Sequence, residues 1–400
     1  MSDWEEASLA DLADYINGRA IKPEECSSSD GIPVIRIKQI NDPESIEDRF
    51  CGDDLDEKNI ARRGDLLFSW SATLKTILWQ GPTGAINQHI FKVLPKEGMD
   101  RIFLHYLIDH SIPALAEESH GSTMKHIKKS ALSAFHLQIP PLPEQKKIAE
   151  ILSGIDSFIR FLRQQSHKLG DAKEALSKEL ISGSSEPCKE SLYGQIPEHW
   201  NESSLGEAIG IENLQTGPFG SQLHAHEYTS EGIPVIMPQD MKDCRVATNK
   251  IARITPDRAQ SLEKHRVQSG DILFSRRGDI GRHAVITENE SGWICGTGCL
   301  RARSQGAINP VFLSELLRHK FALEWLNANA VGQTMLNLNT GILAELPLVV
   351  PPRDEQEKIA NSLSSINERS KKINDQILLT QNLKTALSAD LLSGRKRVSV

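Results

Sequence analysis

Cysteine is scarce in this chain of 400 residues, and the six that occur are scattered. That pattern argues against a secreted disulfide-rich scaffold and favours a reduced, cytoplasmic compartment. Long hydrophobic runs are missing as well, since none approaches the roughly 18 apolar residues of a membrane-spanning helix. The first residues also lack the basic and apolar stretches of a secretory signal. The sequence therefore predicts a globular protein without a membrane partner.

A basic excess is absent too. Lys and Arg total 46 against 53 Asp and Glu, which gives a formal net charge of −7. This disfavours a uniformly basic nucleic-acid binder but leaves room for local basic patches. The chain also lacks a GxxxxGK[ST] phosphate loop, a well-placed GxGxxG and an HExxH zinc motif. Neither Cys295 with Cys299 nor His224 with His226 has further ligands beside it, so we expect no metal site and no catalytic residue in this chain.

An internal duplication organises what is present. The segment from Pro140 reads PPLPEQKKIAEILSGID and the segment from Pro351 reads PPRDEQEKIANSLSSIN, a displacement of 211 residues (351 minus 140). Upstream, Gly-Ile-Pro-Val-Ile occurs at 31–35 and again at 232–236, and Gly-Asp-x-Leu-Phe-Ser occurs at 64–69 and again at 270–275. Solenoid repeats span only about 20–50 residues. The period found here indicates a tandem of whole domains.

The segments 140–184 and 350–397 each predict a long helix. Prolines open each segment and Gly183 or Gly394 closes it, as is typical of helix starts and stops. Apolar residues recur every seven positions, which indicates a coiled-coil seam; the alternative is an amphipathic helix packed on its own domain. The expected core positions are Ile148, Leu152, Ile155, Leu162, Leu176, Leu180, Ile359, Leu363, Ile366, Ile373, Leu387 and Leu391. Polar residues interrupt the seam and can fix its register; they are Ser166, Lys173, Ser370, Thr380 and Lys384.

The remaining segments, 1–139 and 185–349, predict an α+β domain used twice. Short apolar runs bounded by Gly, Pro or Asn predict strands, at Ile32–Ile37, Asp65–Ser69, Ile90–Leu94, Leu137–Ile139, Val235–Met237, Asp271–Ser275 and Leu346–Val350. Helical patterns cover Phe103–Ile108 and Val311–Leu326. We expect two pseudo-symmetric globular domains separated by two long antiparallel coiled-coil helices.

Two nucleic-acid chemistries are disfavoured by the duplicated segments. The Pro-Pro pairs at 140–141 and 351–352 lack the Asn or Asp and the aromatic residue that an amino-methyltransferase motif needs. A Glu-x-Lys string at 144–146 suggests a metal-dependent nuclease, but the second copy reads Glu-Gln-Glu at 355–357 and loses the lysine. A negative charge at a helix start explains both copies better.

Polar and basic residues follow the repeated motifs on expected loops. Arginine can bond guanine edges, asparagine or glutamine can bond adenine, and lysine can bond phosphates, so the mixture suits readout of duplex DNA. For any one cluster, a solvated surface is the alternative. The candidates are Arg62, Arg63, Ser69, Trp70, Lys75, Asn87, Gln88, His89, Lys125 and His126 in the first half, and Ser275, Arg276, Arg277, Arg282, Thr297, Arg301, Gln333 and Thr334 in the second.

Together these residues resemble a known family, the specificity (S) subunits of type I restriction-modification enzymes. The resemblance rests on the repeated motifs above, on a Gly-x-Thr-Met segment, and on Pro-Pro-x-x-Glu-Gln-x-x-Ile-Ala at the start of each long helix. The second half adds Ile-Pro-Glu-His-Trp at 196–200 and Gly-Thr-Gly-Cys-Leu-Arg at 296–301. The first half departs at 87–91, which reads Asn-Gln-His-Ile-Phe, so we expect the two domains to recognise different sequences.

The resemblance implies a non-catalytic, sequence-specific DNA-binding subunit with two target-recognition domains that share a bipartite target. It implies double-stranded DNA and two methyltransferase (modification) subunits as partners, with restriction/translocase subunits joining through them. S-adenosylmethionine, ATP and Mg would then be bound by those partners and not by this chain. The alternative function is a coiled-coil protein-binding scaffold without DNA specificity, and a stand-alone methyltransferase or nuclease is a third.

Overall fold

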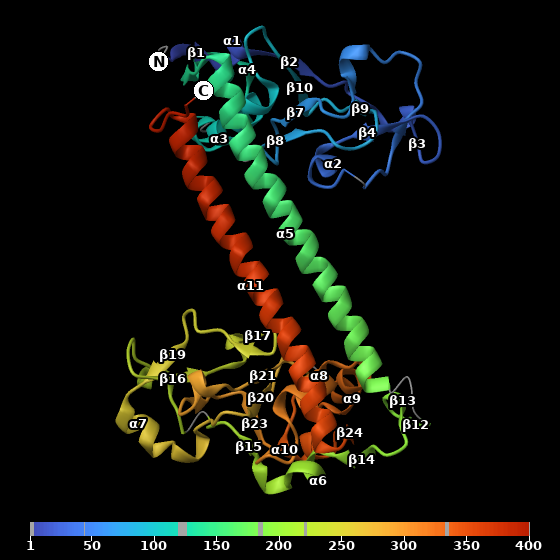
Figure 1. The fold of residues 1–400 in the computed structure, drawn as a ribbon, viewed down its shortest axis with the longest axis vertical. Coiled ribbons are helices and arrows are strands. Elements are labelled where there is room, and N and C mark those ends of the chain that lie inside the picture. Colours follow the sequence, from blue (N-terminus) through green and yellow to red (C-terminus); the bar gives the residue numbers. More distant parts are fainter. Residues whose placement is uncertain are drawn as a thin grey trace. The chain divides into compact units, whose positions relative to one another are not determined.

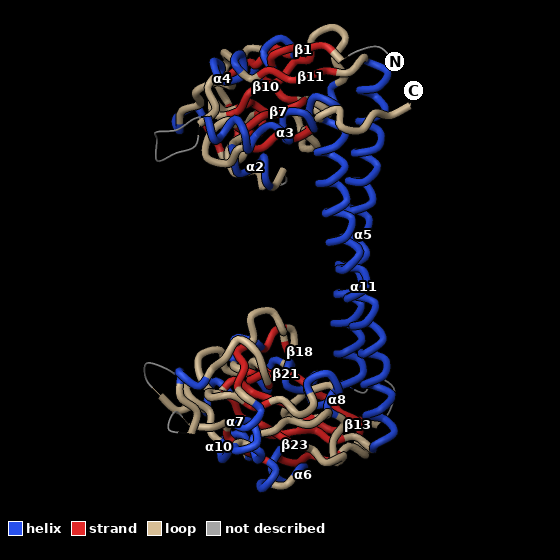
Figure 2. The backbone as a smooth tube through the Cα atoms, turned by 90° about the vertical axis from the view of Figure 1, so that its left-hand side faces the viewer, coloured by secondary structure: helices blue, strands red, loops and turns tan. Residues whose placement is uncertain are grey.

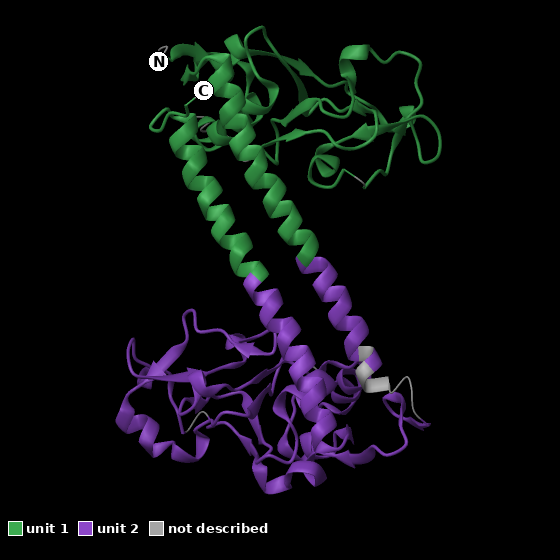
Figure 3. Ribbon diagram, in the orientation of Figure 1, with its two compact units in different colours: residues 1–165, 373–400 green, residues 166–372 purple. Residues whose placement is uncertain are grey.

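The computed structural model describes residues 4–43, 45–118, 126–182, 187–219, 222–332 and 336–399. The chain forms two compact units, unit 1 from residues 1–165 and 373–400 and unit 2 from residues 166–372 (Figure 3). Each unit contains strands, short helices and part of both long helices (Figure 2). No helix in the described part of the chain is both long and apolar enough to cross a membrane.

Unit 1 is built on a four-stranded sheet in the order β2–β10–β7–β8, formed by Ala13–Asn17, Ile90–Pro95, Leu66–Ser69 and Lys75–Leu78 (Figure 1). A second sheet has the order β3–β5–β4–β9–β6, formed by Cys26–Ser27, Arg49–Phe50, Ile32–Ile35, Gly84–Ile86 and Ile60–Ala61. Strand β1 (Glu5–Ser8) pairs antiparallel with β11 (His136–Ile139). The helices are α1 (Leu9–Leu12), α2 (Ile37–Asn41), α3 (Arg101–Glu118) and α4 (Lys129–Ala134).

Unit 2 repeats this plan. Its four-stranded sheet has the order β15–β23–β20–β21, formed by Leu214–Thr216, Cys299–Arg303, Asp271–Ser275 and His283–Val285. A three-stranded sheet has the order β19–β16–β22, formed by Ala252–Ile254, Ile233–Ile236 and Ile294–Cys295. Three antiparallel pairs join β14 to β24, β12 to β13 and β17 to β18, at Asn201–Ser204 with Pro347–Val350, Cys188–Ser191 with Gly194–Pro197, and Met241–Lys242 with Arg245–Val246. The helices are α6 (Leu205–Ile209), α7 (Pro256–Ser261), α8 (Pro310–Arg318), α9 (Lys320–Asn329) and α10 (Thr340–Ala344).

The α+β fold class and the duplication are confirmed, and several element boundaries differ from prediction. Ile37 begins helix α2 instead of ending a strand, because the Gln39 side chain accepts a hydrogen bond from the Arg36 amide at 3.0 Å and caps the helix. Met237 lies beyond strand β16 and is the N-cap of a short 3-10 helix. The expected single helix over 311–326 is two helices, since His319 is extended between α8 and α9 and its ring caps Phe321.

The Gly-Asp-x-Leu-Phe-Ser motif forms the same structural unit in both domains. Its glycines have φ of +90° (Gly64) and +88° (Gly270), a left-handed conformation that favours glycine. The carboxylate of Asp65 accepts from the Arg62 amide and lies 3.0 Å from the Lys92 ammonium. The carboxylate of Asp271 pairs with the Arg303 guanidinium at 2.7 Å. Each motif therefore binds a cation of the neighbouring strand, which is buried in unit 1 (Lys92) and half-buried in unit 2 (Arg303).

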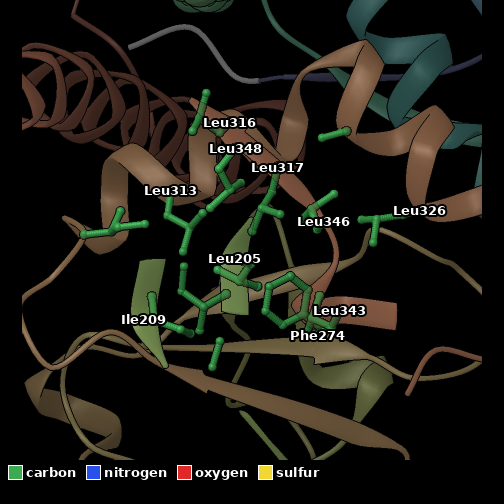
Figure 4. Packing of buried hydrophobic residues seen from close by; sticks show 14 of the residues in the cluster. Leu205, Ile209, Phe274, Leu313, Leu316, Leu317, Leu326, Leu343, Leu346 and Leu348 are labelled. Atoms are coloured by element: carbon green, nitrogen blue, oxygen red, sulfur yellow. The ribbon is translucent and has the colours of Figure 1, made fainter. Parts of the chain in front are cut away.

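The motif's Leu-Phe pair enters the core. In unit 2, leucines from α6, α8, α10 and β24 share a cluster with Phe274 of β20, and Figure 4 labels Leu205, Leu316, Leu343 and Leu348 among them. In unit 1, Phe68 lies in a matching cluster with Phe103, Leu104 and Leu107 of helix α3. Each domain therefore has its own hydrophobic core.

Helix α5 spans Leu142–Ser182 and helix α11 spans Arg353–Leu392. Two contacts show that the segments run antiparallel in unit 1: Glu144 bonds Arg397 and Asp156 bonds Lys384. Residue numbers therefore rise along one segment as they fall along the other. There Ile148 and Leu152 share a cluster with Leu387 and Leu391. In unit 2, Leu176 packs on a cluster that contains Ile359 and Leu363.

Most of the remaining expected seam positions are only partly shielded from solvent. Leu162 is buried, whereas Ile155, Ile366 and Ile373 are half-buried, and the side chain of Leu180 lies outside the described residues. The clusters at the helix ends also include residues of α3 and α8, so these ends pack on their domains as well as on each other. Tertiary packing, not the heptad alone, therefore buries the helix ends.

Two of the polar seam residues are lysines with matching contacts. Lys384 lies 5.1 Å from the Tyr106 ring and 2.7 Å from the Asp156 carboxylate within unit 1. Its counterpart Lys173, 211 positions earlier, lies 3.0 Å from the Glu315 carboxylate within unit 2. Tyr106 on α3 and Glu315 on α8 are equivalent positions. Each comes six residues after the residue whose amide bonds the helix-start glutamine, Asp100 with Gln145 and Asn309 with Gln356. Each lysine therefore ties a long helix to the same place on its domain.

A glutamate anchors the start of each long helix, and it is buried in unit 1 (Glu144) and half-buried in unit 2 (Glu355). Trp4 donates to Glu144 at 3.2 Å, and Trp200 donates to Glu355 at 2.9 Å. In unit 1 the Arg397 guanidinium also binds Glu144, through contacts of 2.7 and 2.8 Å. These hydrogen bonds hold the pKa of Glu144 below its ordinary value. The sequence interpretation of a helix-start charge is therefore incomplete, since the carboxylate also ties both ends of the chain to α5.

We predict that Asp271→Asn will destabilise unit 2 by about 3 kcal/mol, because it removes the buried carboxylate that faces the half-buried Arg303 and the buried Arg301 and leaves their charges uncompensated. The measurement is thermal and urea unfolding of the whole chain. Glu357→Gln is the matched control, since it removes an exposed pair with Arg353 and should change little. Equal stability of the two variants would contradict a supporting role for Asp271.

Glu144→Gln is expected to lower the stability of unit 1 by about 2 kcal/mol at pH 7, because its charge-assisted hydrogen bonds to Arg397 are lost. A depressed folded-state pKa stabilises the protein above the unfolded-state pKa, near 4.5 for a glutamate, and this contribution is lost as pH falls through the folded-state value. Unfolding measured from pH 8 to pH 3 should therefore show wild type and variant converging in acid. Glu150→Gln, which removes an exposed pair with Lys147, is the control and should differ little from wild type in stability at every pH. If Glu144→Gln is still less stable than wild type at pH 3, the charge of Glu144 is not responsible.

Candidate nucleic-acid interface

Three loops meet beyond the C-terminal end of β7 in unit 1, and three meet at the same place beyond β20 in unit 2. In unit 1, Trp70 donates its amide to the His89 carbonyl at 3.3 Å and accepts from the Ile127 amide at 3.0 Å. In unit 2, Arg276 donates to the Gly298 carbonyl at 2.8 Å and accepts from the Leu338 amide at 2.9 Å. We call each meeting point a loop junction, formed by residues 70–71, 89 and 126–127 in unit 1 and by residues 276–277, 298 and 337–338 in unit 2.

The buried serine that ends each strand supports its junction. Ser69 donates to the Ser71 carbonyl at 3.3 Å and Ser275 donates to the Arg277 carbonyl at 2.7 Å. Further bridges pair Ser71 with His126 and Arg277 with Asn337. Because both serines are buried, they hold the loops in place and do not face a ligand. The two junctions thus share a backbone scaffold.

The side chains on that scaffold differ completely between the units. In unit 1 the Trp70 ring lies 5.7 Å from His89 and 5.9 Å from His126, and stacks on Phe91 at 5.6 Å. Within the described part of the chain, the buried Trp70 Nε1 and His89 Nδ1 have no hydrogen-bond partner. The junction of unit 1 is therefore a half-buried aromatic cluster of Trp70, His89 and His126, two of whose ring nitrogens are buried.

In unit 2 the corresponding surface is cationic. Arg276 Nε donates to Asn337 Oδ1 at 3.1 Å, and its guanidinium carbon lies 5.5 Å from the centre of the Phe219 ring. Arg277 beside it is exposed. The two junctions therefore differ in the chemical groups that they could offer to a ligand.

The other candidates of the first half lie around its junction in varied settings. Arg62 pairs with Glu57, and Arg63 donates to Gln80 at 3.3 Å. Gln88 is exposed, Lys75 is half-buried on β8, and Asn87 is buried, where its backbone bonds Ile35 and Ile90. Lys125 lies outside the described residues. Of these candidates, Arg62, Arg63 and Gln88 are exposed to solvent.

Two arginines of the second half hold the domain together. Arg282 pairs with Asp279 at 2.7 Å and donates to the Pro238 carbonyl. Arg301 is buried, and donates to the carbonyls of Lys264 and Arg266 at 3.0 and 2.9 Å. Burial lowers the pKa of Arg301 from its ordinary value. Thr297 is half-buried, and Gln333 and Thr334 lie outside the described residues.

Arg301 has a counterpart that explains its position. It stands opposite Leu273 on β20, just as Lys92 stands opposite Leu67 on β7. Lys92 donates to the Ile60 carbonyl at 2.7 Å, as Arg301 does to Arg266. Both are interior cations, and we leave Arg301 out of the candidate surface.

Sequence reasoning missed Asn337 and Phe219. Asn337 could have been found, because it lies 211 positions after the candidate His126 and takes its place at the junction. Phe219 follows no repeated motif, and the fold alone brings it beside Arg276. Among the residues that the structure describes, no group of three or more His, Cys, Asp or Glu side chains could hold a metal ion.

The chain thus contains two copies of one α+β domain, each joined to the long helices. The two copies carry loop junctions of different chemistry. The chain belongs to the family of type I restriction modification DNA specificity domains, whose model matches residues 1–170 and 197–379. Family membership assigns the chain to DNA target recognition.

Curated relatives match along almost the whole chain. The type I restriction enzyme MjaVIII specificity subunit of Methanocaldococcus jannaschii is 23% identical, with 99% of this chain and 93% of that protein covered. The type I restriction enzyme EcoBI specificity subunit of Escherichia coli is 24% identical, with 98% and 86% covered. The crystal structure of a type I restriction-modification S subunit from M. genitalium matches with a TM-score of 0.62 at 16% identity, covering 98% of this chain and 96% of that one. The solved structure supports the fold.

Proposed function

We propose that this chain is the specificity subunit of a type I restriction-modification enzyme that recognises a bipartite double-stranded DNA target, with one half read by each unit. The observation that carries this proposal is the pair of loop junctions. Both have the same backbone hydrogen bonds, yet one presents Trp70 with two histidines and the other presents two arginines. A scaffold that holds different side chains in equivalent places suits the reading of two different sequences.

The chemistry of the junctions fits duplex DNA. Arginine recognises guanine in the major groove, apolar surfaces contact the thymine methyl group, and lysines bind phosphates. Lys128 and Lys129 are exposed directly after the unit 1 junction, and Arg277 is exposed within the unit 2 junction. The net charge of −7 does not oppose this binding, because the relevant charges are local.

We further propose that the long helices dock two modification subunits, and restriction subunits through them. Within unit 1 the helices expose five large apolar side chains, with fractional exposures from 49% to 70%: Phe158 and Phe161 on α5, and Leu378, Leu379 and Leu383 on α11. A hollow of about 400 Å³ lies among them, lined in part by Ile155, Phe158 and Leu383. Exposed apolar groups gathered in this way mark protein interaction sites. We call these five residues the apolar helix stretch.

Catalysis and cofactors belong to the partners in this proposal. S-adenosylmethionine would be bound by the modification subunits, and ATP with Mg by the restriction subunits, in the cytoplasm where the DNA lies. A protein-binding scaffold without DNA specificity is the alternative, which the apolar helix stretch by itself would equally suit. The different junction chemistries favour the DNA-reading function.

The test of a bipartite target is to co-express the chain with the modification subunit encoded beside it and to map N6-methyladenine across the genome. We expect a split motif of two defined halves around an undefined spacer. Replacing residues 190–349 with the matching segment of a relative should change one half and leave the other intact. A single undivided motif, or a simultaneous change in both halves, would contradict modular reading.

A charge in the apolar helix stretch should weaken docking. Leu379→Glu with Leu383→Glu is expected to reduce the affinity for the modification subunit at least about tenfold, because two apolar contacts are lost and charges are desolvated. Light scattering on purified mixtures would report the complex formed. Asn382→Glu is the control, since it adds charge to the same helix without removing an apolar group. Unchanged assembly of the double variant would place the docking surface elsewhere.

A further inference from the structure

The side chain of Arg276 is held in place more firmly than a surface arginine usually is. Its backbone is fixed on both sides by the hydrogen bonds to Gly298 and Leu338. Its Nε is bonded to the Asn337 amide oxygen, and its guanidinium lies over the Phe219 ring. The planar group is therefore oriented before any ligand arrives, which reduces the rotamer freedom that binding would otherwise remove.

The bonding of this guanidinium leaves its outer edge available. Asn337 occupies only Nε, and none of the described residues accepts a hydrogen bond from either Nη atom. No carboxylate in the described part of the chain pairs with Arg276, in contrast to Arg282, whose donors bond Asp279 and Pro238. A neutral amide and an aromatic face therefore position the group without neutralising it.

Two parallel N–H donors on a fixed plane match one base edge in particular. Guanine presents O6 and N7 as paired acceptors in the major groove, whereas adenine presents an acceptor beside a donor, and arginine meets the guanine edge with both donors. A phosphate would also accept these donors, but it needs no fixed plane and carries no sequence information. The oriented guanidinium therefore favours a base over the backbone.

The matching place in unit 1 supports a role in specificity. Trp70 occupies the position of Arg276, with the same backbone hydrogen bonds, and it has no guanidinium to offer. The buried Ser69 and Ser275 just before them are identical and structural. Within one chain, the supporting residue is therefore kept and the residue on the surface is changed.

We propose that Arg276 is a specificity-determining residue that reads a guanine in the half-target of unit 2, with Asn337 and Phe219 as its positioning residues. This inference rests on the proposed function. It adds the class of base, the residue that recognises it and the contacts that aim that residue.

The experiment uses the complex of the whole chain with its modification subunit. The methylation motif is mapped first, and the half assigned to unit 2 should contain a guanine. Duplexes in which each guanine of that half is replaced in turn by 7-deazaguanine, which lacks N7, are then compared by competition binding. One replacement should weaken wild-type binding by about tenfold, and Arg276→Gln should bind that duplex and the normal one within about twofold of each other.

Two further variants separate recognition from general binding. Asn337→Ala should reduce the discrimination between the two duplexes, whereas Asn337→Asp, which keeps an oxygen acceptor for Nε but adds a negative charge, should retain the discrimination and weaken binding to both duplexes. Arg277→Gln is the matched control, because this exposed neighbour is expected to contact phosphate. It should weaken binding to both duplexes equally and lower the slope of log affinity against log salt by about 1.

Several results would overturn the inference. Arg276→Gln that weakens both duplexes equally, with wild-type thermal unfolding, would make Arg276 a phosphate contact. If the half-target of unit 2 contains no guanine, Arg276 cannot read one. The inference also fails if the methylation motif is unchanged in both Arg276→Gln and Arg276→Lys. A wild-type complex that methylates no split motif would instead refute the proposed function itself, so the two failures are distinguishable.

Discussion

The Glu-Gln pair at the start of each long helix is the contact on which both domains depend. The Gln145 side chain accepts from the Asp100 amide at 2.8 Å and donates to the Pro140 carbonyl at 2.9 Å. Gln356 does the same with Asn309 and Pro351, at 2.8 and 2.9 Å. Each glutamine is buried, so its amide satisfies backbone groups that water does not reach. Together with the glutamate and its tryptophan, it fixes where the helix leaves the domain.

The residues that support the domains, this anchor among them, are alike in the two units, whereas the side chains at the loop junctions differ. The glutamine and the serine at the strand end recur in both units with equivalent partners, and the motif aspartate recurs beside a cation of the neighbouring strand. None of them faces a ligand. The junction side chains depend on this frame for their positions, although Trp70 also packs against the core of unit 1. A change from Trp70 to the chemistry of Arg276 therefore alters recognition without rebuilding the domain.

The architecture could be predicted from sequence because its signals are periodic. The 211-residue displacement showed two domains, and the heptads and their flanking Pro and Gly showed two helices. Individual side chains could not be placed in this way, because pattern does not tell an interior cation from a surface one. Arg301 and Arg276 look alike in sequence, yet one binds backbone carbonyls inside the sheet and the other extends from the junction. Pairing across strands decides between them, and this depends on tertiary structure.

The duplication does not give the long helices the same surface in both units. At the displacement of 211, Phe158 and Phe161 correspond to Arg369 and Lys372, and Leu379 corresponds to Lys168. Unit 1 thus exposes apolar groups where unit 2 carries cations, although Lys384 and Lys173 keep matching contacts with α3 and α8. Apolar contacts gain from removal of water and are insensitive to salt, whereas exposed charges are screened by it. Partners that dock on both halves would therefore meet two surfaces of different physical character. This difference exists even though the same kind of anchor fixes the start of each long helix.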